Sequence, residues 1–371
     1  MDGSAANRNP TMPMHCVDLF AGAGGFSLAA RRVGLTVVAA VEFNKHAAST
    51  YRRNFCSANG STRLYESNIL ELEPKELAAD LAARGVPCDV LLGGPPCQGF
   101  SVHRIRGAGV DDPRNNLILR YFEFVAVLRP KFFLIENVPG ILWSRHKHFL
   151  DRLYFEASRA GYKIEPPAEL DARNFGVPQR RKRIFILGYN GARPDGLVWP
   201  IAPTHGDSEA LQKNTTLTPW MSAETVFGPT PNEDPNNVHM QHHSTLVEVF
   251  RNTPLDGGSR NESGRILPCH RLHDGHKDVY GRVKLNSPGP TMTTACINPS
   301  KGRFVHPLEH HGITLRQAAR FQTFPDDFVF EGGLIAGGQQ IGNAVPIELA
   351  TKILLELSRS FLQTADQPAL S

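Results

Sequence analysis

Cys97 stands in the surroundings that most clearly suit a nucleophile in this sequence. It lies in the run Gly93-Gly-Pro-Pro-Cys-Gln-Gly-Phe-Ser101, just past a predicted buried strand over 88–92. Two prolines stiffen the chain before the thiol, and α/β proteins bind their ligands at the carboxyl ends of strands. A cysteine held there could attack an electron-poor carbon. From this residue alone, a buried structural cysteine in a turn is the favoured interpretation.

An acid and a run of cations occur at two later strand ends. Glu136 follows the apolar run 131–135, where a carboxylate is costly unless it is paired, so we expect it to act as a proton donor. Gln179-Arg-Arg-Lys-Arg183 leads into another strand, and its four cations cannot all be buried. This run fits either a solvated turn or a clamp on a phosphate and on the carbonyl oxygen of a base.

A glycine-rich turn near the start of the chain suits a nucleotide-like ligand. Asp18-Leu-Phe-Ala-Gly-Ala-Gly-Gly-Phe-Ser27 joins a predicted strand to a helix, so the backbone can approach the ligand closely. Glu42 ends the next strand, where an acid can accept hydrogen bonds from ribose hydroxyls. The turn lacks GxGxxG, which argues against a nicotinamide dinucleotide. A tight turn and a solvated strand end remain open alternatives.

The elements around these residues indicate an α/β protein in two domains. Apolar runs predict strands that alternate with helices as in a parallel sheet, and after about residue 190 Pro, Gly, Asn and His crowd the chain. The strands are predicted at 15–20, 35–41, 88–92, 131–135 and 183–188, and the helices at 26–33, 117–128, 315–321 and about 346–362. We expect a disordered N-terminus (1–12), a catalytic domain (13–190), an irregular domain (191–312), a segment returning to the catalytic domain (313–362) and a tail (363–371).

Composition favours an ordinary soluble protein of a reducing compartment. Residues are 41% hydrophobic and 20% charged, with no apolar run long enough for a bilayer and no secretory signal. The six cysteines form no CxxC pair, so we expect free thiols. The net charge of +4 permits a polyanionic partner without requiring one. Cys269 with His270, His273 and His276 does not match common zinc sites, and we expect no metal.

Taken together and in this order, the motifs resemble those of the cytosine-5 DNA methyltransferases over nearly the whole chain. Pro-Pro-Cys97-Gln with Glu136-Asn-Val is highly specific to that family, and the resemblance resumes at Leu315-Arg-Gln-Ala-Ala-Arg320-Phe-Gln-Thr-Phe-Pro and at Gln340-Ile-Gly-Asn-Ala-Val-Pro346. It implies that Cys97 adds to C6 of a cytosine flipped out of the helix. Glu136 would hold a proton at N3, Arg183 would bind O2, and Arg181 would lie nearer the phosphate backbone.

The resemblance also implies a Rossmann-like domain that binds S-adenosyl-L-methionine. Glu42 would hold the ribose, and one departure from the family pattern concerns the adenine: Asn68 stands where the usual residue is Asp, so charge assistance at the adenine amine is lost. The other cofactor residues would come from the glycine turn, from either side of the adenine, from the C-terminal motif and from the proline turn: Asp18, Phe20, Gly22, Gly24, Gly25, Phe43, Ile69, Asn343, Val345 and Pro96.

The expected partner is double-stranded DNA. The loop between Gly99 and Asn116 looks like the family's mobile catalytic loop, although an ordinary surface loop remains possible. The DNA contacts expected outside the base pocket are Gln98, Ser101, Arg104, Arg106, Arg114 and Gln179. Residues 191–312 would recognise the target sequence. That region has 11 Lys+Arg against 12 Asp+Glu, so it is not a basic patch, but it holds ten of the 15 histidines. We expect a bacterial, cytoplasmic, nucleoid-associated monomer, with any cognate restriction endonuclease acting separately.

Two alternatives stay open beside this hypothesis. A catalytically inactive, DNA-binding relative would typically lose Cys97, Glu136 or Arg183, and all three are present. A tRNA-methylating member of the same family would have a shorter region than 191–312, which favours duplex DNA by analogy. We therefore expect a stand-alone or restriction-associated DNA methyltransferase.

Overall fold

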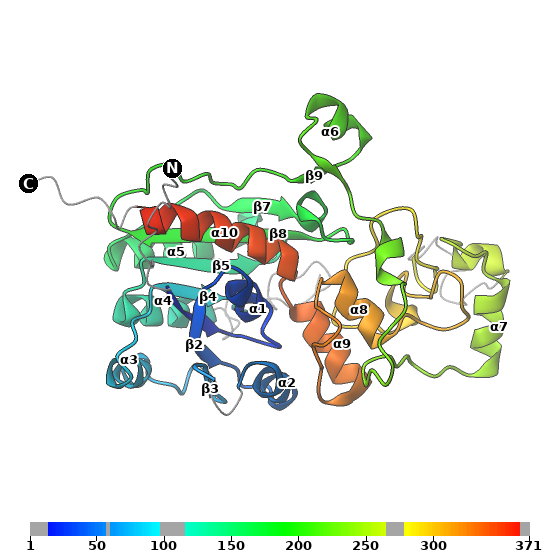
Figure 1. Ribbon diagram of the computed structural model, residues 1–371, viewed down its shortest axis with the longest axis horizontal. Coiled ribbons are helices and arrows are strands. Elements are labelled where there is room, and N and C mark those ends of the chain that lie inside the picture. Colours follow the sequence, from blue (N-terminus) through cyan, green and yellow to red (C-terminus); the bar gives the residue numbers. More distant parts are fainter. Residues whose placement is uncertain (1–13, 57–59, 97–115, 265–277, 364–371) are drawn as a thin grey trace, which may run out of the picture.

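The computed structural model describes residues 14–56, 60–96, 116–264 and 278–363, and its main element is an eight-stranded mixed sheet (Figure 1). The strand order is β3-β2-β1-β4-β5-β8-β6, with β7 also paired to β8. The strands are β1 (His15–Leu19), β2 (Thr36–Val41), β3 (Arg63–Tyr65), β4 (Val90–Gly93), β5 (Phe132–Asn137), β6 (Tyr162–Ile164), β7 (Ala168–Asp171) and β8 (Lys182–Asn190). The strands and helices predicted from the sequence are all present, with ends shifted by two residues or fewer.

The expectation of a parallel sheet holds only for its first five strands. β1 to β5 pair in parallel, whereas β8 runs antiparallel to β5, β6 and β7. The pairing of β5 with β8 extends to Asn137, so Glu136 lies inside the strand and not beyond its end. Because β8 is antiparallel, its first residues lie at the same edge as the carboxyl ends of β4 and β5.

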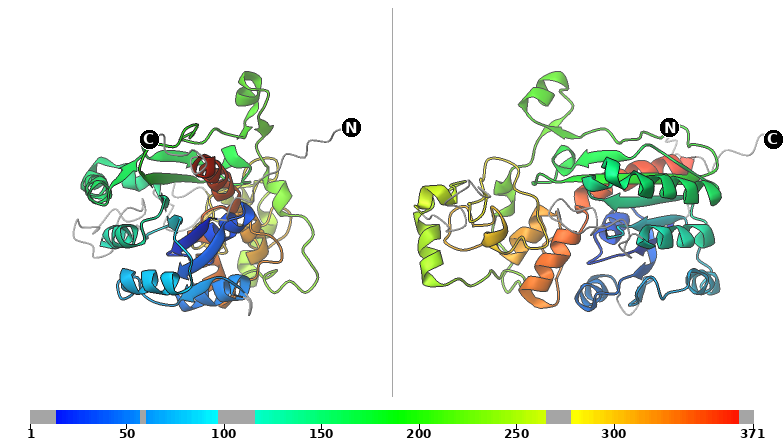
Figure 2. Two further views of the ribbon diagram at one scale, coloured as in Figure 1. Left: turned by 60° about the vertical axis from the view of Figure 1, so that its left-hand side comes forward. Right: turned by 180° about the vertical axis from the view of Figure 1, so that it is seen from behind.

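Helices cover both faces of the sheet, which explains why its strands are apolar without alternation. One face packs against α1 (Gly25–Arg32) and α10 (Ile347–Gln363), which lie side by side (Figure 1, Figure 2). The other face packs against α3 (Pro74–Ala83), α4 (Asn116–Leu128) and α5 (Lys147–Arg159). Neighbouring β5 residues such as Phe132 and Phe133 enter opposite cores, as the two-residue period of a strand requires.

The second part of the molecule consists of short elements and loops. It contains β9 (His205–Gly206), α6 (Ser208–Lys213), β10 (Thr218–Pro219), η5 (Ala223–Val226), α7 (Ser244–Asn252), η6 (Arg260–Ser263) and η8 (Pro299–Lys301). The domain boundary expected at residue 191 stays a prediction. The chain just after it still contacts the sheet domain, where the Trp199 indole donates to the Pro166 carbonyl at 2.9 Å. We call the described residues of 205–312 the small lobe.

The chain returns to the sheet in two steps. α8 (Leu315–Phe321) packs against η5 of the small lobe and against α9 (Gly333–Asn343), and α9 contacts α2 (Lys45–Phe55) of the sheet domain (Figure 1). Only α10 then lies on the sheet itself. Residues 313–346 therefore form a connection between the small lobe and the sheet domain, which we call the α8–α9 segment. Among the described helices, none is long and apolar enough to cross a membrane.

Candidate active site

The glycine turn between β1 and α1 leaves space at one glycine and is tightly packed at two others. Gly22 has a φ of 56°, and a Cβ at this position would meet no atom within 4 Å. Gly24 has a φ of 95°, and a Cβ there would collide with the ring of Phe55 in α2. A Cβ at Gly25 would lie 3.0 Å from the carbonyl oxygen of Val345. The turn is thus open at Gly22, where a ligand could approach the backbone.

Glu42 ties this turn to the start of α2. Its carboxylate accepts the Gly22 N–H at 2.8 Å through Oε2 and the Asn44 N–H at 2.7 Å through Oε1. Asn44 is the N-cap of α2, since its side chain accepts the N–H groups of His46 and Ala47. Burial raises the pKa of Glu42, and the backbone hydrogen bonds oppose that rise. An acid held this way can accept further hydrogen bonds from a polar ligand at the open side of the turn.

Asp18, expected among the ligand-binding residues, is part of the scaffold. Its side chain is 1% exposed and accepts both the N–H and the hydroxyl of Ser27, at 3.1 and 2.6 Å. The Ser27 hydroxyl lies 2.7 Å from the Tyr51 hydroxyl of α2. Burial raises the pKa of Asp18 to about 7. We correct the expectation accordingly: Asp18 holds the N-terminus of α1 in place and does not offer its carboxylate to a ligand.

The remaining residues expected around a cofactor differ in how exposed they are. Phe43 is 72% exposed directly after Glu42, and Ile69 is buried, with its carbonyl oxygen accepting Arg120 Nε at 2.9 Å. Asn68 is half-buried; its Oδ1 accepts the Leu70 N–H at 3.1 Å. In the C-terminal motif, Asn343 is exposed and Val345 is buried. The exposed ring of Phe43, the buried carboxylate of Glu42 and the open turn at Gly22 together form a surface suited to a flat aromatic ligand with hydroxyl groups.

Glu136 and Arg183 form a mostly buried ion pair at the sheet edge. The Arg183 Nε donates to Glu136 Oε1 at 2.8 Å, with 14% of the Arg183 side chain and 11% of the Glu136 side chain exposed. Gly94 leaves room beside the acid, since a Cβ there would lie 3.4 Å from Glu136 Oε2. Burial lowers the pKa of the Arg183 guanidinium, and the carboxylate of Glu136 opposes this shift. The pair therefore presents an acid and a donor side by side.

Asn137 connects this pair to the turn that precedes Cys97. Its Nδ2 donates to the Pro95 carbonyl oxygen at 3.4 Å, and its Oδ1 accepts the Val138 N–H at 2.8 Å. Pro96 is the last described residue of the turn and is exposed. The turn that precedes Cys97 in the sequence is thus tied to the end of β5 through Asn137, the residue next to Glu136.

Gln179 and Arg181, expected to contact DNA, are buried inside the protein instead. Gln179 donates to the Phe321 carbonyl at 2.6 Å and accepts the Met292 N–H at 2.9 Å. Arg181 is 1% exposed and donates to the carbonyl oxygens of Met292, Gly342 and Ala344 at 2.7 to 3.0 Å. These bonds use both side chains to join β8, the small lobe and the α8–α9 segment. In this structure neither side chain can reach a phosphate, and the two expectations are corrected to a structural role.

The family is established by comparison with known proteins. A model of the C-5 cytosine-specific DNA methylase family matches residues 14–359. The chain belongs to this family. The Type II methyltransferase M1.HphI of Haemophilus parahaemolyticus is 34% identical over 351 residues, covering 92% of this chain and 86% of the relative. The Type II methyltransferase M.DdeI of Desulfomicrobium norvegicum is 30% identical over 399 residues, covering 94% and 89%.

Solved structures of other proteins share the fold of this chain. A prophage-encoded protein of E. coli has a TM-score of 0.70 at 24% identity, over 94% of this chain and 99% of its own. The methyltransferase EhMeth of Entamoeba histolytica has a TM-score of 0.63 at 14% identity, over 94% and 99%. The expected fold class is confirmed as a mixed α/β methyltransferase fold with a central sheet.

Several residues that were expected in the site of this chain lie outside its described part. They are Cys97, Gln98, Ser101, Arg104, Arg106 and Arg114, together with Cys269, His270, His273 and His276. Their assignments remain predictions. Within the described residues, the structure brings together Glu136, Arg183 and the Pro95–Pro96 turn at one end of β4, β5 and β8, and Gly22 with Glu42 beside β1 and β2.

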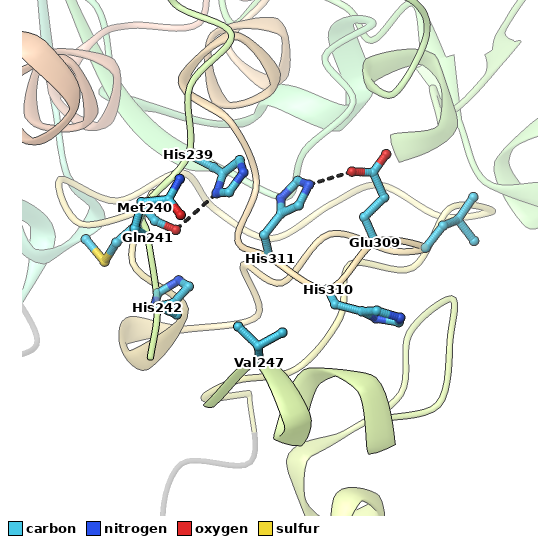
Figure 3. A pocket seen from close by; sticks show the side chains of 9 residues that line it. His239, Met240, Gln241, His242, Val247, Glu309, His310 and His311 are labelled. Carbon is cyan, nitrogen blue, oxygen red and sulfur yellow. Dashed lines mark hydrogen bonds and ion pairs between the residues drawn. The ribbon is translucent and has the colours of Figure 1, made fainter. Parts of the chain in front are cut away.

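A histidine-lined cavity that the sequence did not predict lies in the small lobe (Figure 3). Its volume is about 430 Å³, and its lining residues are His239, Met240, Gln241, His242, Val247, Leu308, Glu309, His310 and His311. The His311 ring lies 2.5 Å from the Glu309 carboxylate at Nε2 and 2.7 Å from the Gly312 carbonyl at Nδ1, and it stacks on the His239 ring with 3.9 Å between the ring centroids. Among the described residues, none of those expected to act in catalysis or to bind the cofactor lines this cavity.

Proposed function

We propose that this protein transfers a methyl group from S-adenosyl-L-methionine to C5 of a cytosine in double-stranded DNA, through a covalent bond between Cys97 and C6. The observation that carries the proposal is the Glu136–Arg183 pair beside the turn that leads to Cys97. Family membership and the Type II methyltransferase names of the relatives support the reaction class. The finer steps follow from the chemistry of the residues.

The Glu136–Arg183 pair matches the hydrogen-bonding edge of cytosine. That edge offers acceptors at O2 and N3 and a donor at N4. Arg183 can donate to O2, while a protonated Glu136 can donate to N3 and accept from N4 with its second oxygen. Uracil and thymine carry a carbonyl oxygen at position 4 and a proton at N3, which would meet these groups with the wrong polarity. The pair therefore selects cytosine as the base.

Cys97 would supply the electrons that cytosine C5 lacks. Its thiolate forms a bond to C6, the electron pair of the C5–C6 double bond moves into the C4–C5 bond, and the pair of the C4–N3 double bond moves onto N3, which takes a proton from Glu136. The resulting enamine is nucleophilic at C5 and accepts the methyl group. Removal of the C5 proton by a base then restores the double bond and expels the thiolate. Because C6 is unreachable inside a stacked duplex, the target base would first be flipped out of the helix.

The described residues fit the cofactor. S-adenosyl-L-methionine supplies an electrophilic methyl group on a sulfonium. Glu42, which is buried and already ordered by Gly22 and Asn44, would accept the ribose hydroxyls. Phe43 would stack on the adenine opposite Ile69, and the backbone at Gly22 would approach the methionine part with Phe20, Gly24 and Gly25 shaping the turn. Asn343 and Val345 would close the pocket, and Pro96 would lie between the cofactor and the base.

Restoring the family's acid at position 68 is expected to tighten cofactor binding. A charge-assisted hydrogen bond exceeds a neutral one by about 1 kcal/mol, roughly fivefold in Kd. Asn68 lies 3.4 Å from the Glu71 carboxylate, so Asn68→Asp alone would place two acids together. We expect the full gain in Asn68→Asp combined with Glu71→Gln, measured by calorimetry with S-adenosyl-L-methionine. Glu71→Gln alone is the control, and equal binding by the double variant would mean that Asn68 is not at the adenine amine.

The small lobe would read the target sequence. It lies apart from the cofactor turn, and its residues are neither mainly basic nor apolar, as expected of a surface that reads base edges and not only phosphates (Figure 1). Its segment Gly289–Met292 bonds to the strand entry 178–181 and must stay in place.

Exchanging part of the small lobe is therefore expected to switch the methylated sequence. The exchange replaces residues 205–280 with the matching segment of M1.HphI and keeps Gly289 to Met292. The chimera should methylate the relative's site and bind the cofactor with unchanged Kd, measured by bisulfite sequencing and calorimetry. The wild-type chain and M1.HphI are the two controls. A chimera active on the original site would refute the assignment of recognition to this lobe.

Bisulfite sequencing of DNA incubated with the protein and S-adenosyl-L-methionine tests the proposed function directly. Protected cytosines at one recurring sequence would establish both activity and target. Transfer to tRNA in place of DNA would assign the chain to the tRNA-methylating branch, and no transfer to either would indicate an inactive relative. A cytoplasmic, nucleoid-associated monomer beside a separately acting restriction endonuclease is part of the same proposal.

A further inference from the structure

Residues 329–331 of the α8–α9 segment are bound by side chains on both sides. The amide of Asn54, in α2, accepts the Val329 N–H at 3.1 Å and donates to the Val329 carbonyl at 2.9 Å. The amide of Asn236, in the small lobe, accepts the Phe330 N–H at 2.8 Å and donates to the Phe330 carbonyl at 3.0 Å. Two asparagines from different parts of the molecule thus hold two adjacent residues in the manner of neighbouring strands. We call this arrangement the asparagine bridge.

The α2 side of the bridge leads to the cofactor turn. α2 begins at Asn44, which donates to Glu42, and its Phe55 ring packs against Gly24. The Thr50 hydroxyl accepts the Glu331 N–H at 2.8 Å, and Phe55 packs edge-on against Phe328 at 6.0 Å. One helix therefore touches both the glycine turn and the α8–α9 segment. Because packed side chains yield little, a shift of the α8–α9 segment would be passed through α2 to the glycine turn.

The Asn236 side of the bridge leads into the small lobe. Asn236 is 4% exposed, and its carbonyl accepts the Arg316 N–H at 2.8 Å. Arg316 is fully buried in α8 and forms a two-point ion pair with Asp234 at 2.6 and 2.9 Å. Its guanidinium also donates to the Phe328 carbonyl at 2.9 Å. The segment 234–238 is thereby fixed to the same stretch of chain that Asn54 holds from the other side.

We infer that Asn54 and Asn236 are positioning residues that set the small lobe against the cofactor side of the sheet domain and so align DNA with the catalytic pair. The inference rests on the proposed function. Within the described residues, the hydrogen bonds of the Asn54 side chain go to Thr50 and Val329 and those of the Asn236 side chain go to Phe330, so neither side chain is bonded to the Glu136–Arg183 pair. If the bridge is cut, the free enzyme spends part of its time with the lobe out of alignment, and the apparent affinity for DNA falls by the aligned fraction.

Separate measurement of KM and kcat tests this inference. With DNA carrying the site found by bisulfite sequencing, Asn54→Ala and Asn236→Ala should each raise KM for DNA about tenfold, the size expected for two lost hydrogen bonds. The kcat at saturating DNA and the Kd for S-adenosyl-L-methionine should stay within about twofold of wild type. The double variant should be little worse than either single one, because one bridge is cut only once. Asn190→Ala, at an exposed asparagine that ends β8 outside the small lobe, is the control and should change nothing.

Isosteric variants cover the case in which an alanine variant does not fold. In Asn54→Asp and Asn236→Asp, the side-chain oxygen can still accept the backbone N–H. Once the new carboxyl group is ionised, it has no proton to donate to the backbone carbonyl, so the KM for DNA relative to wild type should grow as the pH rises. A fall in kcat with unchanged KM, additive effects in the double variant, or an equal effect of Asn190→Ala would overturn the inference. A wild-type protein that methylates no DNA would instead reject the proposed function on which the inference rests.

Discussion

Replacing Cys97 by alanine is expected to reduce methyl transfer to background, a loss of at least about 10⁴-fold, the size seen when an enzyme loses its nucleophile. Without the thiolate, cytosine C5 stays too poor a nucleophile to accept the methyl group. Binding of DNA and of S-adenosyl-L-methionine should persist, because the alanine removes one sulfur at the end of a turn held by Asn137 and Pro95. The measurement is incorporation of a radiolabelled methyl group into DNA under single-turnover conditions.

The cysteines in the described part of the chain supply the control for this prediction. Cys16, Cys88 and Cys296 are buried, and burial raises the pKa of all three thiols, so they stay protonated at neutral pH. Cys56 is partly exposed, and burial raises its pKa as well. Cys56→Ala should therefore retain full activity. Substantial methyl transfer by Cys97→Ala would show that another group is the nucleophile.

Glu136→Gln is expected to lower the rate of methyl transfer by about 10²- to 10⁴-fold, the range of general acid catalysis. The amide oxygen of glutamine can still accept the Arg183 Nε–H, so the paired geometry of the wild type should survive. What the variant lacks is a proton to give to N3 while the thiolate adds to C6. The measurement is the single-turnover rate with saturating DNA and cofactor, which separates this step from binding.

Glu169→Gln is the matched control for that variant. Glu169 lies in β7, which pairs with β8 on the side opposite β5. Its carboxylate pairs with Lys182, the residue before Arg183, at 2.8 Å. It is also a glutamate paired with a cation of the same strand, but it is exposed and away from Glu136. Its variant should remain within about twofold of wild type. A Glu136→Gln rate close to that of Glu169→Gln would remove Glu136 from the proton transfer.

Much of the fold could be predicted because burial leaves a direct mark on the sequence. Continuous apolar runs such as 131–135 predicted strands that are covered on both faces, and Leu315–Phe321 was predicted as a helix with the ends that the structure has. Strand direction could not be predicted this way. An apolar run looks the same in a parallel and an antiparallel pair, so the reversed course of β8 appears only in its pairing with β5.

The site was predictable where the chemistry depends on local sequence and not where it depends on distant partners. Glu136 and Arg183 were predicted from their motifs, and the structure pairs them. Arg181 belongs to the same motif, but its acceptors lie 111 to 163 residues further along the chain, so its burial was not visible in the sequence. The same reason hides Asn54 and Asn236, since each is an ordinary polar residue until residues 329 and 330 are placed beside it.

Trapping on DNA with 5-fluorocytosine at the target tests the central claim most directly. The fluorinated base has no C5 proton, so after methyl transfer the bond between Cys97 and C6 should not break. The wild-type protein should give a protein–DNA adduct that survives denaturing electrophoresis and requires S-adenosyl-L-methionine, whereas Glu136→Gln should form it much more slowly and Cys97→Ala should form none while still binding DNA. An adduct in Cys97→Ala, or methylated DNA without any trapped wild-type protein, would contradict the account.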